Sequence, residues 1–141
     1  MMRTRLESMS PTLGEAFRQA KAAKKRKAVL TASAIAASQN GLRGKIIDDA
    51  LGLLRQGGGG NKLRPELESL CREYDDAYFR LQQEIGSEQE MLLQFRKARA
   101  AAALAFALSP DAEHVHEALY ESIMSADDSE EMVRVLTETL S

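Results

Sequence analysis

Cysteine, tryptophan and proline are scarce in this chain, and each shortage narrows the structural choices. The single cysteine, Cys71, excludes an internal disulfide and is typical of a reducing compartment. Tryptophan is absent and aromatic residues make up only 5% of the sequence, so the core must consist mainly of Ala, Leu, Ile, Val and Met. This palette favours helices and gives little material for strands. We therefore expect an all-α protein.

Long hydrophobic runs are missing as well. The two most small-sided stretches, 31–38 and 98–108, are far shorter than the roughly twenty apolar residues that cross a bilayer, so we expect no membrane span. Residues 24–38 place basic side chains before a modest apolar stretch, as a signal peptide does, but they begin too far into the chain and contain little leucine. The sequence predicts a cytoplasmic protein, with the nucleus as the alternative in a eukaryotic host.

Apolar residues recur at helical spacing through most of the chain and predict a bundle of about six helices. Ser10, Ser87 and Asp128 each stand where a side chain would cap the first turn of a helix. At the centre we expect a coiled-coil-like helical hairpin made of residues 63–85 and 88–108. The expected helices are 10–38, 42–55, 63–85, 88–108, 109–125 and 128–140.

Four consecutive glycines mark the clearest break in the pattern, because glycine loses the most backbone entropy when it is ordered in a helix. The sequence predicts a flexible N-terminal leader, a helical pair with a basic segment, a glycine-rich connector and a C-terminal helical bundle that is acidic at its end. These parts are 1–9, 10–56, 57–61 and 62–141, and we expect them to form one globular unit.

Small side chains dominate the stretches 31–38 and 98–108, and small side chains allow helix axes to approach closely. We expect these two faces to pack together or to meet a partner helix. The alternative is that alanine is abundant there only because it is a good helix former.

No complete catalytic or metal-binding motif appears. His114 and His116 would lie about 200° apart on a helix and could not share one ion. Glu113 and His116 have the spacing of one di-iron element, but the chain has no third histidine to complete such a site, which makes a metal or enzyme site there a weak alternative. The glycine run lacks the pattern of a phosphate-binding loop. We therefore expect a non-enzyme with no cofactor, metal ion or catalytic residue.

Charge is distributed unevenly along the chain. Residues 1–27 hold eight basic and two acidic side chains, whereas residues 110–141 hold nine acidic side chains and Arg134 alone. On a continuous helix the basic cluster would encircle the axis, so this stretch should be accessible. It fits nucleic-acid phosphates, a nuclear import signal or an acidic protein surface. The alternative is that this basic stretch is only a solvated helix face with no binding role. The partner-binding candidates within it are Lys24, Lys25, Arg26 and Lys27.

A second set of candidates forms an apolar seam that steps alternately by four and three residues, as partner-seeking helices do. Its members are Leu63, Leu67, Leu70, Tyr74 and Leu81. We therefore expect a helical protein–protein interaction module, such as an adaptor, regulator or chaperone-like subunit, that binds partner helices or a second copy and forms a homo-oligomer. The main alternative is a nucleic-acid-binding regulator that uses the basic helix 18–27.

Overall fold

The computed structural model describes residues 3–57 and 62–141, and in those ranges the chain forms eight α-helices, a 3₁₀ turn and no strand. The all-α helical bundle is thus confirmed. The predicted connector 57–61 lies, apart from Gly57, outside the described residues. The elements are α1 (Arg5–Met9), α2 (Pro11–Gln19), α3 (Ala22–Gln39), α4 (Lys45–Arg55), α5 (Arg64–Gln83), α6 (Glu88–Ala107), the 3₁₀ turn η1 (Ala112–His114), α7 (Val115–Ser125) and α8 (Ser129–Leu140).

The three predicted helix caps are present. The side-chain oxygens of Ser10, Ser87 and Asp128 accept hydrogen bonds from backbone N–H groups three residues later, at 3.2, 3.1 and 3.0 Å. Each bond satisfies one of the amides that a helix leaves free in its first turn. The starts of α2, α6 and α8 are therefore set locally by the sequence.

The N-terminal segment differs from the flexible leader that the sequence suggested. Residues Arg5–Met9 form α1, which Thr4 caps by accepting a hydrogen bond from the backbone N–H of Glu7. Leu6 is completely buried in the core, and Arg5 forms ion pairs with two carboxylates of α7. Burial of one leucine together with these ion pairs holds a segment whose own sequence is too short for a stable helix.

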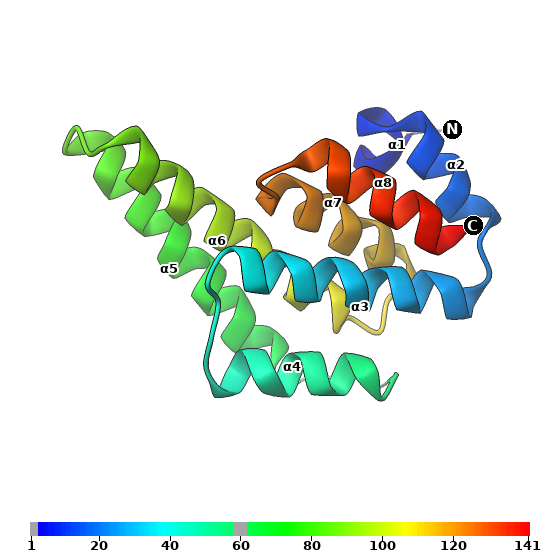
Figure 1. The fold of residues 1–141 in the computed structure, drawn as a ribbon. Helices are drawn as coiled ribbons and strands as arrows, with labels where there is room; N and C mark the ends of the chain where they lie inside the picture. The colour runs from blue at the N-terminus through cyan, green and yellow to red at the C-terminus, as the bar shows by residue number, and fades with distance from the viewer. Residues whose placement is uncertain (1–2, 58–61) are drawn as a thin grey trace.

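The expected continuous helix 10–38 is also divided. Ala20 and Lys21 are extended, with ψ angles of 147° and 158°, and they separate α2 from α3. The break allows α2 to pack against α1 and α8 while α3 packs against α6, α7 and α8 (Figure 1). Tertiary contacts therefore override a local sequence that would support one long helix.

The predicted central hairpin is present as α5 and α6, which lie side by side along their length (Figure 1). At the open end of the hairpin, opposite its turn, α6 packs against α3, α4 and α7. The turn between α5 and α6 projects away from the other helices (Figure 1). The small-sided stretches of α3 and α6 do meet, because Ala36 and Ala37 share one buried cluster with Ala100 and Ala101. Among the described residues, no helix combines the length and apolar character needed to cross a membrane.

Candidate functional site

The first part of the predicted apolar seam faces the interior of the chain. Leu67 is fully buried, and Leu63, Leu70 and Tyr74 pack against the same cluster, which α3, α4 and α6 complete. These four side chains therefore stabilise the chain's own fold, and the completely buried Leu67 presents no surface to a partner. Leu81, the last member of the seam, is partly buried near the turn of the hairpin.

Beyond the interior seam, large apolar side chains are exposed around the end of the hairpin. We call residues 76–95 the hairpin tip. Phe79 is 55% exposed, Ile85 92%, Leu92 46% and Leu93 43%. Exposed apolar side chains normally occur singly on a protein surface, so four of them on one projecting element make the hairpin tip the candidate site.

A groove runs along the tip between its two helices. It is open, has a volume of about 330 Å³ and is lined by Tyr78, Glu88, Met91, Leu92 and Phe95. The ring of Tyr78 lies 5.5 Å from that of Phe79 and 6.1 Å from that of Phe95, measured between centroids, so α5 and α6 hold each other's aromatic side chains in place. The groove is therefore built from packed side chains on two helices.

The turn at the tip is strained. Ile85 has a φ of +55° and is the one non-glycine residue in the described ranges with a positive φ. The backbone N–H of Gly86 donates to the carbonyl of Leu81 at 2.7 Å, which closes the C-terminus of α5. Gly86 packs closely on Leu81, since a Cβ there would lie 2.9 Å from the end of the Leu81 side chain and 3.1 Å from its carbonyl oxygen. Ile85 consequently occupies the left-handed position that glycine usually takes at a helix end.

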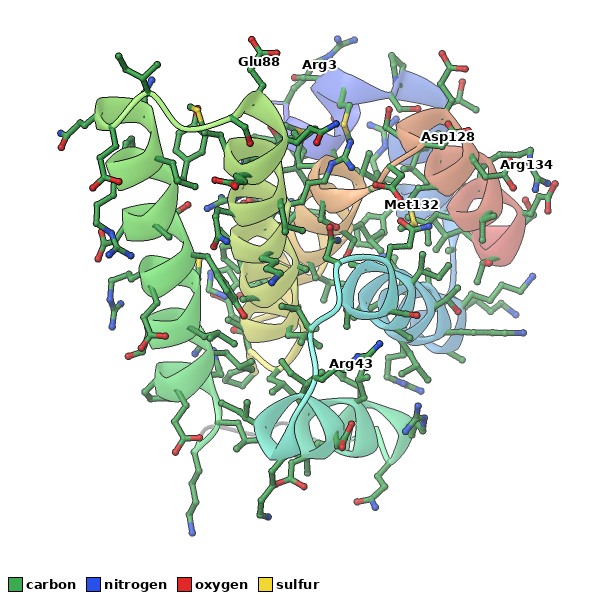
Figure 2. The ribbon with its side chains drawn as sticks, turned by 60° about the vertical axis from the view of Figure 1, so that its left-hand side comes forward. Arg3, Arg43, Glu88, Asp128, Met132 and Arg134 are labelled. Carbon is green, nitrogen blue, oxygen red and sulfur yellow. The ribbon has the colours of Figure 1, made fainter. Side chains whose placement is uncertain are left out.

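Acidic side chains outnumber basic ones at the hairpin tip, and one of them, Glu88, lines the groove. The hairpin tip carries four of them, Asp76, Glu84, Glu88 and Glu90, against the single basic side chain of Arg80. Within the described residues none of these four carboxylates has an ion-pair partner, and Glu88 points into solvent at the start of α6, beside the turn (Figure 2). Ser87 and the first-turn glutamates also stabilise the start of α6.

The predicted basic candidates lie far along the chain from the tip, around the start of α3. Lys24, Arg26 and Lys27 are exposed, whereas Lys25 is partly buried with its Nζ 4.5 Å from the centre of the Phe17 ring. Lys24 Nζ donates a hydrogen bond to the backbone oxygen of Ser141, beside α8. The structure thus keeps these four residues together but does not bring them to the apolar seam.

Sequence reasoning missed a cluster of charged side chains at the centre of the molecule. Arg99 on α6 donates to Asp75 on α5 at 3.1 Å and to Glu121 on α7 at 3.2 Å. Glu121 also accepts from Arg5 of α1 at 3.2 Å, and burial raises its pKa even though both arginines oppose that shift. The cluster fastens four helices together. An arginine inside the alanine-rich run 98–108 was the signal that could have revealed it.

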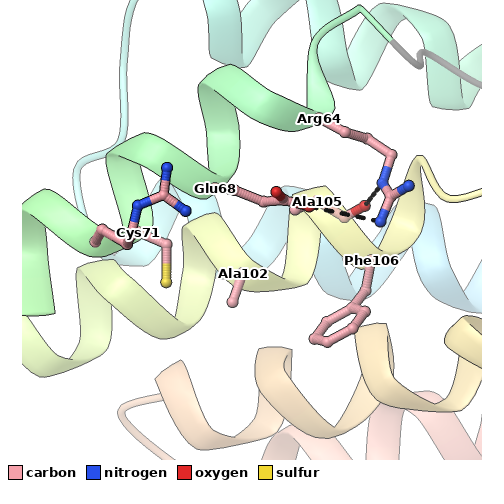
Figure 3. Close-up of a pocket in the computed structure, with 7 residues that line it drawn as sticks. Arg64, Glu68, Cys71, Ala102, Ala105 and Phe106 are labelled. Carbon is pink, nitrogen blue, oxygen red and sulfur yellow. Dashed lines mark hydrogen bonds and ion pairs between the residues drawn. The ribbon is translucent and has the colours of Figure 1, made fainter.

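Cys71 lies at the edge of this cluster and lines a second hollow between α5 and α6, of about 310 Å³ (Figure 3). Its Sγ is 3.7 Å from Asp75 Oδ2 and 3.7 Å from Arg99 Nη2, and burial raises the pKa of the thiol to about 11. A thiol with that pKa is protonated at neutral pH and is a poor nucleophile. In the same hollow Arg64 is tied to the Ala105 carbonyl and to Glu68, so its charge is already satisfied.

Both histidines pack against aromatic rings, and the buried Nδ1 of His116 has no hydrogen-bond partner among the described residues. His114 lies against Phe106 with its Nδ1 2.7 Å from Ser109 Oγ, and His116 lies edge-on to Phe17. Across residues 3–57 and 62–141, no three His, Cys, Asp or Glu side chains come together in a way that could hold a metal ion. The geometry at Glu113 and His116 therefore supplies no observation in favour of an ion there.

The exposed side chains of the tip were also missed, because the sequence pattern was read for a single seam. Phe79, Leu92 and Leu93 follow or adjoin another large apolar residue, and such off-seam neighbours were the available signal.

Comparison of the chain with protein-family models, with curated protein sequences and with solved structures finds no significant match to any of them.

Proposed function

We propose that this chain is a non-enzymatic protein-interaction module that binds a helix of a partner protein at the hairpin tip. The observation that carries this proposal is the group of exposed Phe79, Ile85, Leu92 and Leu93 on the part of the molecule that projects furthest from the bundle. Aromatic and aliphatic anchors of this kind dominate the binding energy of protein interfaces.

Two further features support the proposal. The groove between α5 and α6 has the form that an amphipathic helix occupies when it lays its apolar face against another protein. Ile85 is both strained and 92% exposed. It therefore destabilises the folded state and exposes apolar surface, and so little of its side chain is buried that contacts within the chain do not offset this cost. Strained residues concentrate at functional sites, where binding compensates for them.

Photo-crosslinking tests the proposal. A photoreactive amino acid replaces exposed Gln89 at the tip, and in a control it replaces exposed Glu138 on α8. We expect a discrete crosslinked protein in the native host from the tip position only, and its loss when Leu92→Ser is added. If position 89 gives no discrete product, or if both positions give the same one, the interaction module is refuted.

A second candidate function is nucleic-acid binding by the basic segment, and one observation favours it. Lys21, Arg26 and Lys27 surround the start of α3, where no side chain caps the free amides, and within the described residues none of the three has an acidic partner. Phosphate groups suit such a site. We expect any duplex DNA or RNA binding at low salt to disappear when Lys24, Lys25, Arg26 and Lys27 are changed to Gln. Absence of binding in the unchanged protein refutes this candidate.

A further inference from the structure

We infer that the partner segment at the hairpin tip is a basic amphipathic helix, with large apolar residues on one face and Lys or Arg on its flanks. The inference deepens the proposed function and rests on it. It concerns the chemistry of the partner, which the exposed apolar side chains alone do not specify.

The apolar half of the inference comes from the shape of the groove. Glu88, Met91, Leu92 and Phe95 follow one another at helical spacing and form a stripe two turns long on α6, about 10 Å from end to end at the rise of an α-helix. Tyr78 of α5 closes the opposite side. A helix that lies along this groove would insert apolar residues from successive turns, at the i, i+3 or i+4, and i+7 positions used in helix-in-groove recognition.

The basic half comes from the charges. Glu88 itself lines the groove, and Asp76, Glu84 and Glu90 lie in the same tip. None of these four carboxylates has an ion-pair partner among the described residues, so the tip carries a net negative charge that an approaching molecule meets. A basic partner would be steered towards the tip and oriented on it.

The same charges argue against a second copy of this chain as the occupant. Two tips that met face to face would bring eight carboxylates together against two Arg80 side chains, and like charges at an interface cost affinity. Arg80 is exposed on α5 and does not line the groove. Charge complementarity therefore selects a foreign basic helix.

A peptide titration tests the inference. The probe is a fluorescently labelled short peptide of leucine and lysine in helical spacing, followed by anisotropy at low and moderate salt, and the comparison peptide replaces each lysine with glutamate. We expect the lysine peptide to bind at least about tenfold more tightly than the glutamate peptide, and the difference to shrink as salt screens the charges.

Matched variants place the binding at the groove. Leu92→Ser removes a groove side chain, whereas Met124→Ser removes an exposed apolar side chain on α7 that does not line the groove. We expect about tenfold weaker binding from Leu92→Ser and little change from Met124→Ser. Neutralising Glu84, Glu88 and Glu90 to Gln should weaken binding several-fold at low salt, and neutralising Glu130, Glu131 and Glu138 on α8 should not.

Each of the following outcomes overturns the inference. Equal binding of the two peptides removes charge complementarity, and equal effects of the tip and α8 variants remove the site. A dimer in light scattering that Leu92→Ser converts to a monomer assigns the tip to a second copy. If the lysine peptide fails while the crosslinker at Gln89 still captures a discrete protein dependent on Leu92, the partner's chemistry is wrong and the interaction function stands. If neither the lysine peptide binds nor the crosslinker captures a protein, both the partner's chemistry and the interaction function are refuted.

Discussion

The strain at Ile85 leads to a specific stability prediction, because removing this side chain should stabilise the protein. Ile85 has a φ of +55°, and a left-handed conformation costs an L-residue about 1–2 kcal/mol, with β-branched residues at the upper end. In the variant Ile85→Gly this cost disappears. The same backbone hydrogen bond from Gly86 to Leu81 remains available to close α5.

Two smaller effects oppose the gain. Glycine gives the unfolded chain more freedom, which costs about 0.5–1 kcal/mol. Loss of the isoleucine side chain costs little, because it is 92% exposed and only about a tenth of the ~1.5–3 kcal/mol from full burial is at stake. The net expectation is that Ile85→Gly raises the free energy of unfolding by about 0.5–1 kcal/mol, and the melting temperature by about 2–3 °C in a chain of this size.

The assay is urea unfolding of the purified protein, followed by circular dichroism, with Ile85→Ala as the matched control. Alanine removes most of the side chain but keeps a Cβ in the left-handed conformation, so the control should stay within about 0.5 kcal/mol of the unchanged protein. The strain assigned to Ile85 is refuted if Ile85→Gly is no more stable than Ile85→Ala. If Ile85 contacts the partner, both variants should bind the lysine peptide more weakly although only one gains stability, which is the trade-off expected of a binding residue.

Three further predictions concern the bundle. A methyl group added by Gly14→Ala would come within 2.6 Å of the Glu7 side chain and should lower the free energy of unfolding by about 1–3 kcal/mol. The control Gly52→Ala has open space around the new methyl group and should raise the free energy of unfolding by about 0.5–1 kcal/mol. Equal effects of the two variants in thermal melts would contradict the close packing of α1 on α2. Leu6→Ala should cost about 2–5 kcal/mol if α1 belongs to the core, and an unchanged melting temperature would show that it does not. Burial raises the pKa of Glu121 above its usual 4.5, so the folded chain holds this proton more tightly than the unfolded chain. The free energy of unfolding should therefore fall, relative to that of Glu121→Gln, as pH rises from about 4.5 towards neutral. A difference between the two proteins that stays flat or rises with pH would contradict this prediction.

The sequence by itself determined the helical class, the hairpin and several helix ends. Ser10, Ser87 and Asp128 cap where they were expected to, because a cap needs only a side-chain oxygen and the backbone amide a few residues later. The hairpin followed from apolar periodicity, which depends on one helix at a time. The packing of the alanine-rich parts of α3 and α6 was also anticipated, since small side chains allow close approach.

Only the tertiary structure decided which of those apolar and charged side chains remain available. Leu67 and Leu92 both lie at apolar positions of the hairpin helices. Leu67 is buried against α3, α4 and α6, whereas Leu92 is exposed on the part of the hairpin that extends beyond the other helices. The break at Ala20–Lys21, the docking of α1 and the union of Arg5, Arg99 and Glu121 depend on contacts between residues distant in the chain. A local pattern records what each helix would bury, but only the spatial arrangement of all the helices determines what is left uncovered.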